Sequence, residues 1–255
     1  QLKEKLKKLD KQRGMQRRAR RRSNVLTVAI VGYTNAGKST LFNQLTGASV
    51  GSRNQLFATL DPTMREVRLP SGQSIILSDT VGFVSNLPHE LISAFHATLE
   101  EVIEADFIIH VRDAVHPDCD IQHSDVSNVL QELGVEQKPT LEIFNKIDLL
   151  SENEREVLTN QLKRAQPSMT AISALTGLGC DNILSVLDKH FTSFWKTFNF
   201  KIPFSDGAAI AWLYKVGSVQ DQENSKSSIC ITVSLLESDK LKFQKKFGIV
   251  GALIS

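Results

Sequence analysis

Short apolar runs alternate with amphipathic stretches along the first 200 residues of the chain. The β-branched run 25–31 precedes a glycine-rich loop, and the pattern then predicts a helix at Lys38–Thr46 that ends at Gly47. Later runs continue the alternation, with strands expected at 107–111, 140–145 and 170–173 and helices at 90–103, 121–133, 152–164 and 181–197. This order is typical of βαβ units, in which helices cover both faces of a parallel sheet.

One pair of predicted strands departs from that alternation. The runs 66–69 and 74–78 are joined by Pro70-Ser71-Gly72, which indicates a hairpin and an antiparallel edge on the sheet. Residues 47–65 before it are polar and rich in Gly, Asn and Thr, so we expect a long loop there. Long loops inside compact domains are usually functional. The sequence therefore predicts a mostly parallel, six-stranded α/β sheet.

The pattern changes near Phe198. We expect the segment 201–203, Lys-Ile-Pro, to break the preceding helix. Beyond it the sequence suggests strands at 208–216 and 228–236, joined by a polar loop, and a short helix at 239–247. We therefore predict a main domain over residues 25–198 and a small α+β domain over residues 199–255.

The charge of the chain is unevenly distributed. Residues 1–22 hold eleven Lys or Arg and two acidic residues, a net of +9, so the rest must carry −7 to give the chain's +2. Leu2, Leu6 and Leu9 share one helical face, so residues 1–24 are predicted to form a basic helix that belongs to a longer protein. Such a segment favours a polyanionic partner, most often nucleic acid, and the alternative is a solvated helix.

Composition limits the setting in which the protein works. No apolar run reaches the roughly 18 residues of a membrane-spanning helix. The three cysteines are far apart and form no CxxC pair, which argues against a disulfide framework or a zinc knuckle. We therefore expect a cytoplasmic protein. We also expect it to be a monomer.

The strongest chemical signal is Gly32-Tyr33-Thr34-Asn35-Ala36-Gly37-Lys38-Ser39, which matches G-x-x-x-x-G-K-[ST] between a predicted strand and a predicted helix. The glycines let the backbone curl so that several N–H groups face one phosphate, and the helix N-terminus adds its dipole. Lys38 can reach the β- and γ-phosphates, and Ser39 can ligate Mg²⁺. The predicted nucleotide contacts in this loop are Gly32, Asn35, Ala36, Gly37, Lys38, Ser39 and Thr40.

A second motif, Asp79-Thr80-Val81-Gly82, follows the hairpin and begins 41 residues after Lys38. An acid at a strand end that faces the phosphate loop suits an outer-sphere contact to Mg²⁺. Gly82 lets its backbone N–H approach the γ-phosphate. D-x-x-G alone is a weak signal, and the spacing after the phosphate loop strengthens it.

Two further motifs indicate the base. In Asn145-Lys146-Ile147-Asp148 the carboxylate of Asp148 can accept hydrogen bonds from N1–H and N2–H₂ of guanine, whereas adenine would leave this charge unpaired. Ser173-Ala174-Leu175 follows the next strand, and the Ala174 N–H can donate to guanine O6. The four motifs together predict a P-loop GTPase that takes GTP, and they argue against a nucleoside kinase.

In order and position these motifs resemble those of the translation-factor-related GTPases, and a finer match is similar to the HflX family of ribosome-associated GTPases. The segments that carry this likeness are Gln55–Thr63, Asp79–Val84, Leu87–Leu91, Ala94–Glu100 and His110–Asp113. The likeness is good over residues 1 to about 198 and looser beyond them. It implies that the basic helix 1–24 is the end of the family's upstream helical linker and that the family's N-terminal domain lies outside this sequence. It implies that Thr59 contacts Mg²⁺ and the γ-phosphate, with Thr63 as the alternative, and that Lys38, Thr59 and Gly82 serve catalysis.

The resemblance also implies roles for two neighbouring positions. Phe83 stands where many GTPases carry a water-orienting Gln, so intrinsic hydrolysis should be slow, or else Phe83 is simply a packed residue. In some related GTPases an Asn at the position of Asn35 ligates K⁺, and the alternative is that it only tightens the loop.

The family resemblance implies that the protein hydrolyses GTP to GDP with Mg²⁺ and acts on the large (50S) ribosomal subunit and its rRNA. Splitting or rescue of ribosomes under stress belongs to the same expectation. Two alternatives stay open at this point: a GTPase of tRNA modification or other RNA processing, and a nucleotide-binding switch with negligible turnover.

Overall fold

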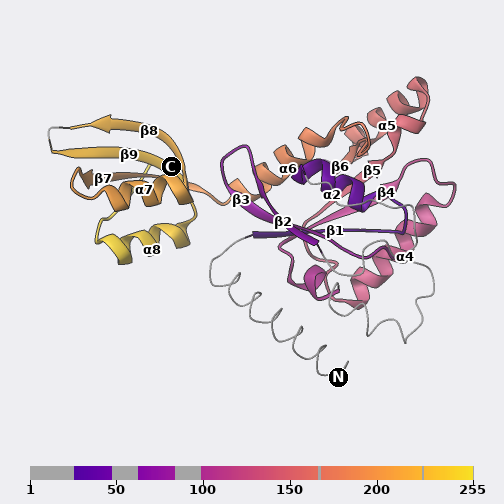
Figure 1. Ribbon diagram of the computed structural model, residues 1–255, viewed down its shortest axis with the longest axis horizontal. Coiled ribbons are helices and arrows are strands. Elements are labelled where there is room, and N and C mark those ends of the chain that lie inside the picture. The colour runs from indigo at the N-terminus through magenta and orange to yellow at the C-terminus, as the bar shows by residue number, and fades with distance from the viewer. Residues whose placement is uncertain (1–25, 48–62, 84–98, 166–167, 226, 255) are drawn as a thin grey trace. The chain divides into compact units, whose positions relative to one another are not determined.

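The computed structural model describes residues 26–47, 63–83, 99–165, 168–225 and 227–254 (Figure 1). The predicted basic helix 1–24, Thr59 and most of the predicted helix 90–103 lie outside these residues. The described chain forms two compact units, and residues 68–73 and those from 184 onward make up the second. Each unit is described by itself below.

The first unit is built on a six-stranded sheet in the order β2-β3-β1-β4-β5-β6. β1 pairs in parallel with β3 and β4, and β5 pairs in parallel with β4 and β6. The predicted mostly parallel six-stranded sheet is therefore confirmed. The strands are β1 (Leu26–Gly32), β2 (Thr63–Arg68), β3 (Ser74–Asp79), β4 (Phe107–Asp113), β5 (Thr140–Asn145) and β6 (Met169–Ala171).

Helices cover both faces of this sheet, and Figure 1 shows α2 and α4 on opposite sides of it. Every residue of β4 is buried, as expected for a central strand with helices on both faces. On one face Ala29, Val31 and Ile108 pack with Val126 and Leu130 of α4. The helices are α2 (Lys38–Thr46), α4 (Cys119–Glu132), α5 (Glu152–Ala165) and α6 (Cys180–Thr192), with a helical stretch at 99–104 and a 3-10 turn, η1 (Ile147–Leu149).

The predicted hairpin joins β2 and β3, and the Leu69 N–H donates to the Gln73 carbonyl at 2.8 Å. β2 begins at Thr63, so the prediction of a loop up to residue 65 is wrong at its end. Asp188 of α6 holds the turn, because its carboxylate accepts hydrogen bonds from the Ser71 N–H at 3.1 Å and the Ser71 hydroxyl at 2.5 Å.

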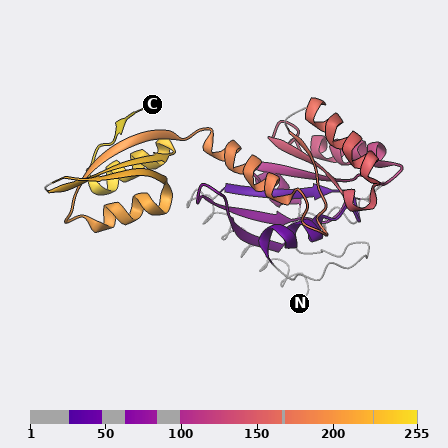
Figure 2. The same ribbon diagram turned by 90° about the horizontal axis from the view of Figure 1, so that it is seen from above.

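The second unit carries an antiparallel sheet in the order β10-β7-β9-β8. The chain order is βαββαβ, the split-βαβ arrangement of ferredoxin-like folds. α7 and α8 cover the same sheet face (Figure 2), where Phe200, Leu213 and Phe243 are fully buried. The elements are β7 (Lys196–Pro203), α7 (Gly207–Val216), β8 (Ser218–Asn224), β9 (Ser228–Leu235), α8 (Glu237–Phe247) and β10 (Ala252–Leu253).

Three predictions for this region are wrong. The expected strand 208–216 is helix α7, because Asp206 caps it through the Ala209 N–H at 3.1 Å and the core buries Ala209 and Leu213, one helical turn apart. A short, continuously apolar run does not distinguish a buried helix from a buried strand.

The predicted helix 181–197 stops at Thr192, and β7 begins at Lys196 with alternating buried residues. The predicted polar loop between the last two strands contains β8, whose largely exposed residues carry no apolar alternation because it is an edge strand.

The boundaries 1–24, 25–198 and 199–255 of the predicted domains stay a prediction. No helix within the described ranges is long and apolar enough to cross a membrane.

Candidate nucleotide-binding site

The glycine-rich loop connects β1 to α2, and two of its glycines are required by close packing. Gly32 has φ +151°, and a Cβ there would lie 2.2 Å from the Val111 carbonyl oxygen. Gly37 has φ +96°, and its Cβ would lie 2.2 Å from Nδ2 of Asn145. The loop is therefore pressed against β4 and β5, with its N–H groups at the start of α2, as phosphate binding requires.

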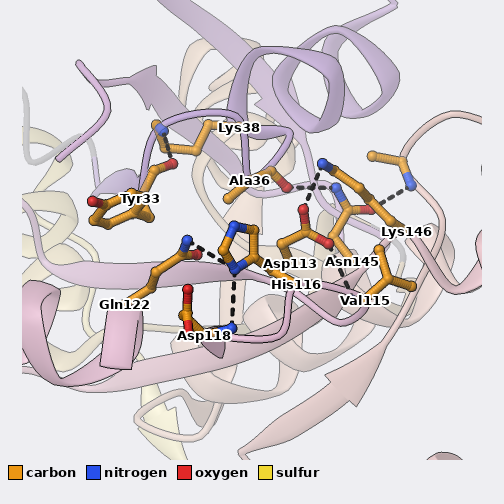
Figure 3. Close-up of polar contacts among 11 residues, drawn as sticks. Tyr33, Ala36, Lys38, Asp113, Val115, His116, Asp118, Gln122, Asn145 and Lys146 are labelled. Atoms are coloured by element: carbon orange, nitrogen blue, oxygen red, sulfur yellow. Dashed lines mark hydrogen bonds and ion pairs between the residues drawn. The ribbon is translucent and has the colours of Figure 1, made fainter. Parts of the chain in front are cut away.

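Lys38 is the first residue of α2 and is buried. Its ammonium donates to the Tyr33 carbonyl at 2.7 Å (Figure 3). Burial lowers the pKa of Lys38 to about 8, and the nearby carboxylate of Asp79 partly offsets this. A Cβ at Gly82 would lie 2.9 Å from Nζ of Lys38, so the second motif passes directly beside this lysine.

Two of the predicted Mg²⁺ ligands also lie next to each other. The Ser39 hydroxyl donates to Oδ2 of the buried Asp79 at 2.7 Å. Thr80 anchors the end of this motif to β1, because its hydroxyl donates to the Ile30 carbonyl at 2.6 Å. The two predicted ligands that are described, Ser39 and Asp79, supply the oxygen donors that Mg²⁺ prefers, whereas the third, Thr59, lies outside the described residues.

Phe83 is buried and packs with Val31, Val102 and Ala105 in the hydrophobic core. Its backbone binds the phosphate loop in both directions, since the Phe83 N–H donates to the Gly32 carbonyl at 3.1 Å and its carbonyl accepts from the Thr34 N–H at 2.8 Å. Phe83 is therefore packed, as one interpretation expects, and its side chain carries no group that can orient water, as the other requires.

Asn145 joins the base motifs to the phosphate loop. Its Nδ2 donates to the Ala36 carbonyl at 2.9 Å (Figure 3), and its Oδ1 accepts from the Ala174 N–H at 2.9 Å. Asp148 is held by the Ser173 hydroxyl, which donates to its Oδ1 at 2.5 Å. Asn145 thereby positions both halves of the site, while Leu175, next to Ala174, is 74% exposed.

The predicted residues that the structure describes therefore meet at one edge of the sheet. They follow the carboxyl ends of β1, β3, β5 and β6, the place where ligands bind in open α/β sheets. Asn35 also lies in this loop, exposed and with φ +62°.

Asp113 also lies at this site, although the sequence pattern assigns it no role. It ends β4, next to Asn145 in the sheet register, and its Oδ2 lies 2.6 Å from Nζ of Lys146. The only sequence signal was its position at the end of a buried strand within the family-like segment His110–Asp113.

Comparisons with known proteins agree with this geometry. Residues 27–146 match the family model of the 50S ribosome-binding GTPases, and residues 158–252 match that of the HflX C-terminal domain. GTPase HflX of Magnetococcus marinus is 44% identical over 234 residues, which are 92% of this chain and 53% of that protein. GTPase HflX of Escherichia coli is 34% identical over 244 residues, 94% of this chain and 57% of that protein.

Among solved structures, Era in complex with MgGDPNP and a segment of 16S ribosomal RNA is similar with a TM-score of 0.52 and 27% identity. That match covers 65% of this chain and 56% of Era. The chain spans about half the length of the curated relatives that it matches.

Proposed function

The chain belongs to the HflX family of GTPases, and from that premise we propose that it binds GTP with Mg²⁺ and hydrolyses it to GDP and phosphate. One observation carries the proposal: Asn145 bonds to both the phosphate loop and the loop of Ala174. A single buried side chain thus links the phosphate half of the site to the guanine half.

The residues of the site supply binding and charge stabilisation. Lys38 places a cation beside the β- and γ-phosphates, and the Gly82 N–H faces the γ-phosphate. Ser39 would ligate Mg²⁺ directly and Asp79 through water, with Thr59 as the third contact. Bound there, Mg²⁺ would neutralise phosphate charge. Because Phe83 cannot hydrogen-bond to water, intrinsic turnover is slow and a partner completes the site.

The guanine half rests on the carboxylate of Asp148, which the Ser173 hydroxyl orients. The carboxylate accepts from N1–H and N2–H₂ of the base, and the Ala174 N–H donates to O6. An adenine would offer this partly buried carboxylate no hydrogen-bond donor from the base, which is costly. GTP is therefore the substrate, GDP the product, and ATP is rejected.

A first experiment measures phosphate release from GTP by the wild-type chain and by Ser39→Ala and Lys38→Ala. We expect each variant to lose about 3 kcal/mol or more of transition-state stabilisation. Lys189→Ala on α6 is the control, because this exposed lysine lies outside the site. Near-normal turnover in both site variants would refute the assignment.

We also propose that Asn35 ligates K⁺ beside the phosphates. The exposed position of Asn35 and its left-handed backbone within the loop support the idea. Hydrolysis should then rise when Na⁺ is replaced by K⁺ at constant ionic strength, and Asn35→Ala should remove the difference. Equal rates in both salts would leave Asn35 as a residue that only shapes the loop.

For the partner, we propose the large (50S) ribosomal subunit and its rRNA, with ribosome splitting or rescue as the outcome. The description of the matching family model and the +9 charge of residues 1–22 support this. We place this activity in the cytoplasm and assign it to a monomer. The alternative of an RNA-processing GTPase has some support in the likeness to Era, which was solved with 16S rRNA.

The partner experiment titrates large subunits, and separately small subunits, against the chain and a variant that starts at Ser23. We expect the large subunit to raise hydrolysis, and the shorter variant to bind it more weakly with a flatter salt dependence, because fewer phosphates are neutralised. Basal hydrolysis should not change. Stimulation by small subunits alone would favour the alternative, and equal affinity of both chains would remove residues 1–22 from the interface.

A further inference from the structure

Lys146 has a backbone conformation that residues other than glycine rarely adopt. Its φ is +70°, and within the described ranges only Asn35 shares a positive φ among the non-glycine residues. Asn and Asp tolerate this region because they bond locally to the backbone, whereas a lysine has no such compensation. A strained residue of this kind persists when its surroundings hold it, and such residues cluster at binding sites.

The end of β4 holds Lys146 in place (Figure 3). Its ammonium lies 2.6 Å from Oδ2 of Asp113, whose side chain is 10% exposed. The Ala114 N–H donates to the Asn145 carbonyl at 2.9 Å, so the residue before Lys146 is fixed from the same loop. The other oxygen of Asp113 accepts from the Val115 N–H at 3.2 Å, which orients the carboxylate.

The loop that carries Asp113 is itself well anchored. The His116 N–H donates to the Asp113 carbonyl at 3.3 Å, and the Cys119 N–H donates to the His116 carbonyl at 3.1 Å. Nδ1 of His116 accepts from the Asp118 N–H at 3.1 Å. These hydrogen bonds fix the position of Asp113, and Lys146 forms its ion pair with this fixed carboxylate.

We propose that Asp113 is a positioning residue for base selection, which holds Lys146 in its left-handed conformation and so sets the direction of Asp148. The inference rests on the proposed GTP-binding function. Lys146 lies between Asn145, which the sheet and two side-chain hydrogen bonds fix, and Asp148. A rotation about φ of Lys146 toward the common negative region would therefore swing Asp148 away from Ser173 and the base.

Two substitutions separate the interactions of Asp113. Asp113→Asn keeps an oxygen that can accept from the Val115 N–H but loses the charge that attracts Lys146, and Asp113→Ala loses both. Glu132→Gln is the matched control, because it removes an exposed carboxylate from the neighbouring α4.

The first measurement compares affinities for GDP, for IDP, which lacks the 2-amino donor to Asp148, and for pyrophosphate. We expect Asp113→Asn to weaken GDP binding about tenfold, a typical size for a lost charge-assisted contact. The affinity for IDP should fall less, so the ratio of the GDP affinity to the IDP affinity should decrease. The affinity for pyrophosphate should not change. Equal losses for all three ligands would show general damage to the fold and overturn the proposal.

The second measurement needs no nucleotide. Lys146→Gly removes the backbone strain, since glycine adopts a positive φ at no cost. Asp113→Asn should then lower the urea midpoint of unfolding in the chain with Lys146 but not in the chain with Gly at this position. If the effects of Asp113→Asn and Lys146→Gly on the urea midpoint are additive, the proposed role of Asp113 is overturned, whether or not GDP binds. Failure of the wild-type chain to bind GDP instead overturns the proposed function.

Discussion

Raising the pH from 7 to 9 should weaken nucleotide binding through one side chain, Lys38. Burial lowers the pKa of this lysine to about 8, although Asp79 offsets part of the effect. The phosphates of GDP or GTP bind the ammonium form. Below pH 8 the charge is present before the nucleotide arrives, whereas above pH 8 binding must take up a proton.

The size of the effect follows from that pKa. At pH 9 about one molecule in ten carries a charged Lys38, so the affinity should fall about tenfold relative to pH 7, or about 1.4 kcal/mol. The stability of the nucleotide-free chain should move in the opposite direction. The unfolded chain, in which the lysine has its usual pKa of 10.5, holds more protons between pH 8 and 10.5. The free energy of unfolding therefore rises through this window, by about 3 kcal/mol at most.

Calorimetric titration of GDP at pH 7 and pH 9 tests this prediction. When it is repeated in two buffers with different ionisation enthalpies, the data should show close to one proton taken up per GDP at pH 9 and almost none at pH 7. Lys38→Met is the control, because its weaker binding should lose this pH dependence. An equal affinity at both pH values, or the same fall in Lys38→Met, would refute the reasoning.

Four other substitutions test particular contacts. Asp148→Asn should weaken GTP binding and favour xanthosine triphosphate, whose O2 needs a donor; an unchanged preference in direct titrations would contradict the guanine assignment. Asn145→Ala leaves the Ala36 carbonyl and the Ala174 N–H without their buried partner, and should cost about 2–4 kcal/mol of unfolding free energy in urea. Phe83→Ala should cost about 3–5 kcal/mol in the same assay, and a loss below about 1 kcal/mol would remove it from the core. Asp188→Ala should lower stability by about 1–3 kcal/mol, whereas Lys189→Ala on the same helix should have no effect.

The sequence predicted the phosphate-binding elements well because they are continuous in the chain. β1, the glycine-rich loop and α2 follow one another, and α2 begins and ends at the predicted residues. A turn that needs glycine, a helix start and a buried strand each depend on local backbone preferences and periodicity. The same holds for the hairpin of β2 and β3 and for the mostly parallel six-stranded sheet.

Local patterns were insufficient in the second unit. α7 is apolar over most of its length, and β8 is polar except for Val219, so neither shows the periodicity of its own element type. Tertiary contacts determined the secondary structure of both segments. α7 packs on the sheet face formed by β7 and β9, and β8 pairs with β9 at the edge of the sheet. Packing partners far along the chain override weak local preference.

By itself the sequence determined the kind of site, because the phosphate and guanine motifs each specify their chemistry in a few neighbouring residues. Only the tertiary structure decided how these motifs support one another. It placed Asn145 between two loops, set Asp113 against Lys146, and buried Phe83 in the core. The hydrogen bonds of Asn145 and the ion pair of Asp113 with Lys146 join residues 29 to 109 positions apart. The order and register of the parallel strands bring such residues together, which no local pattern along the chain encodes.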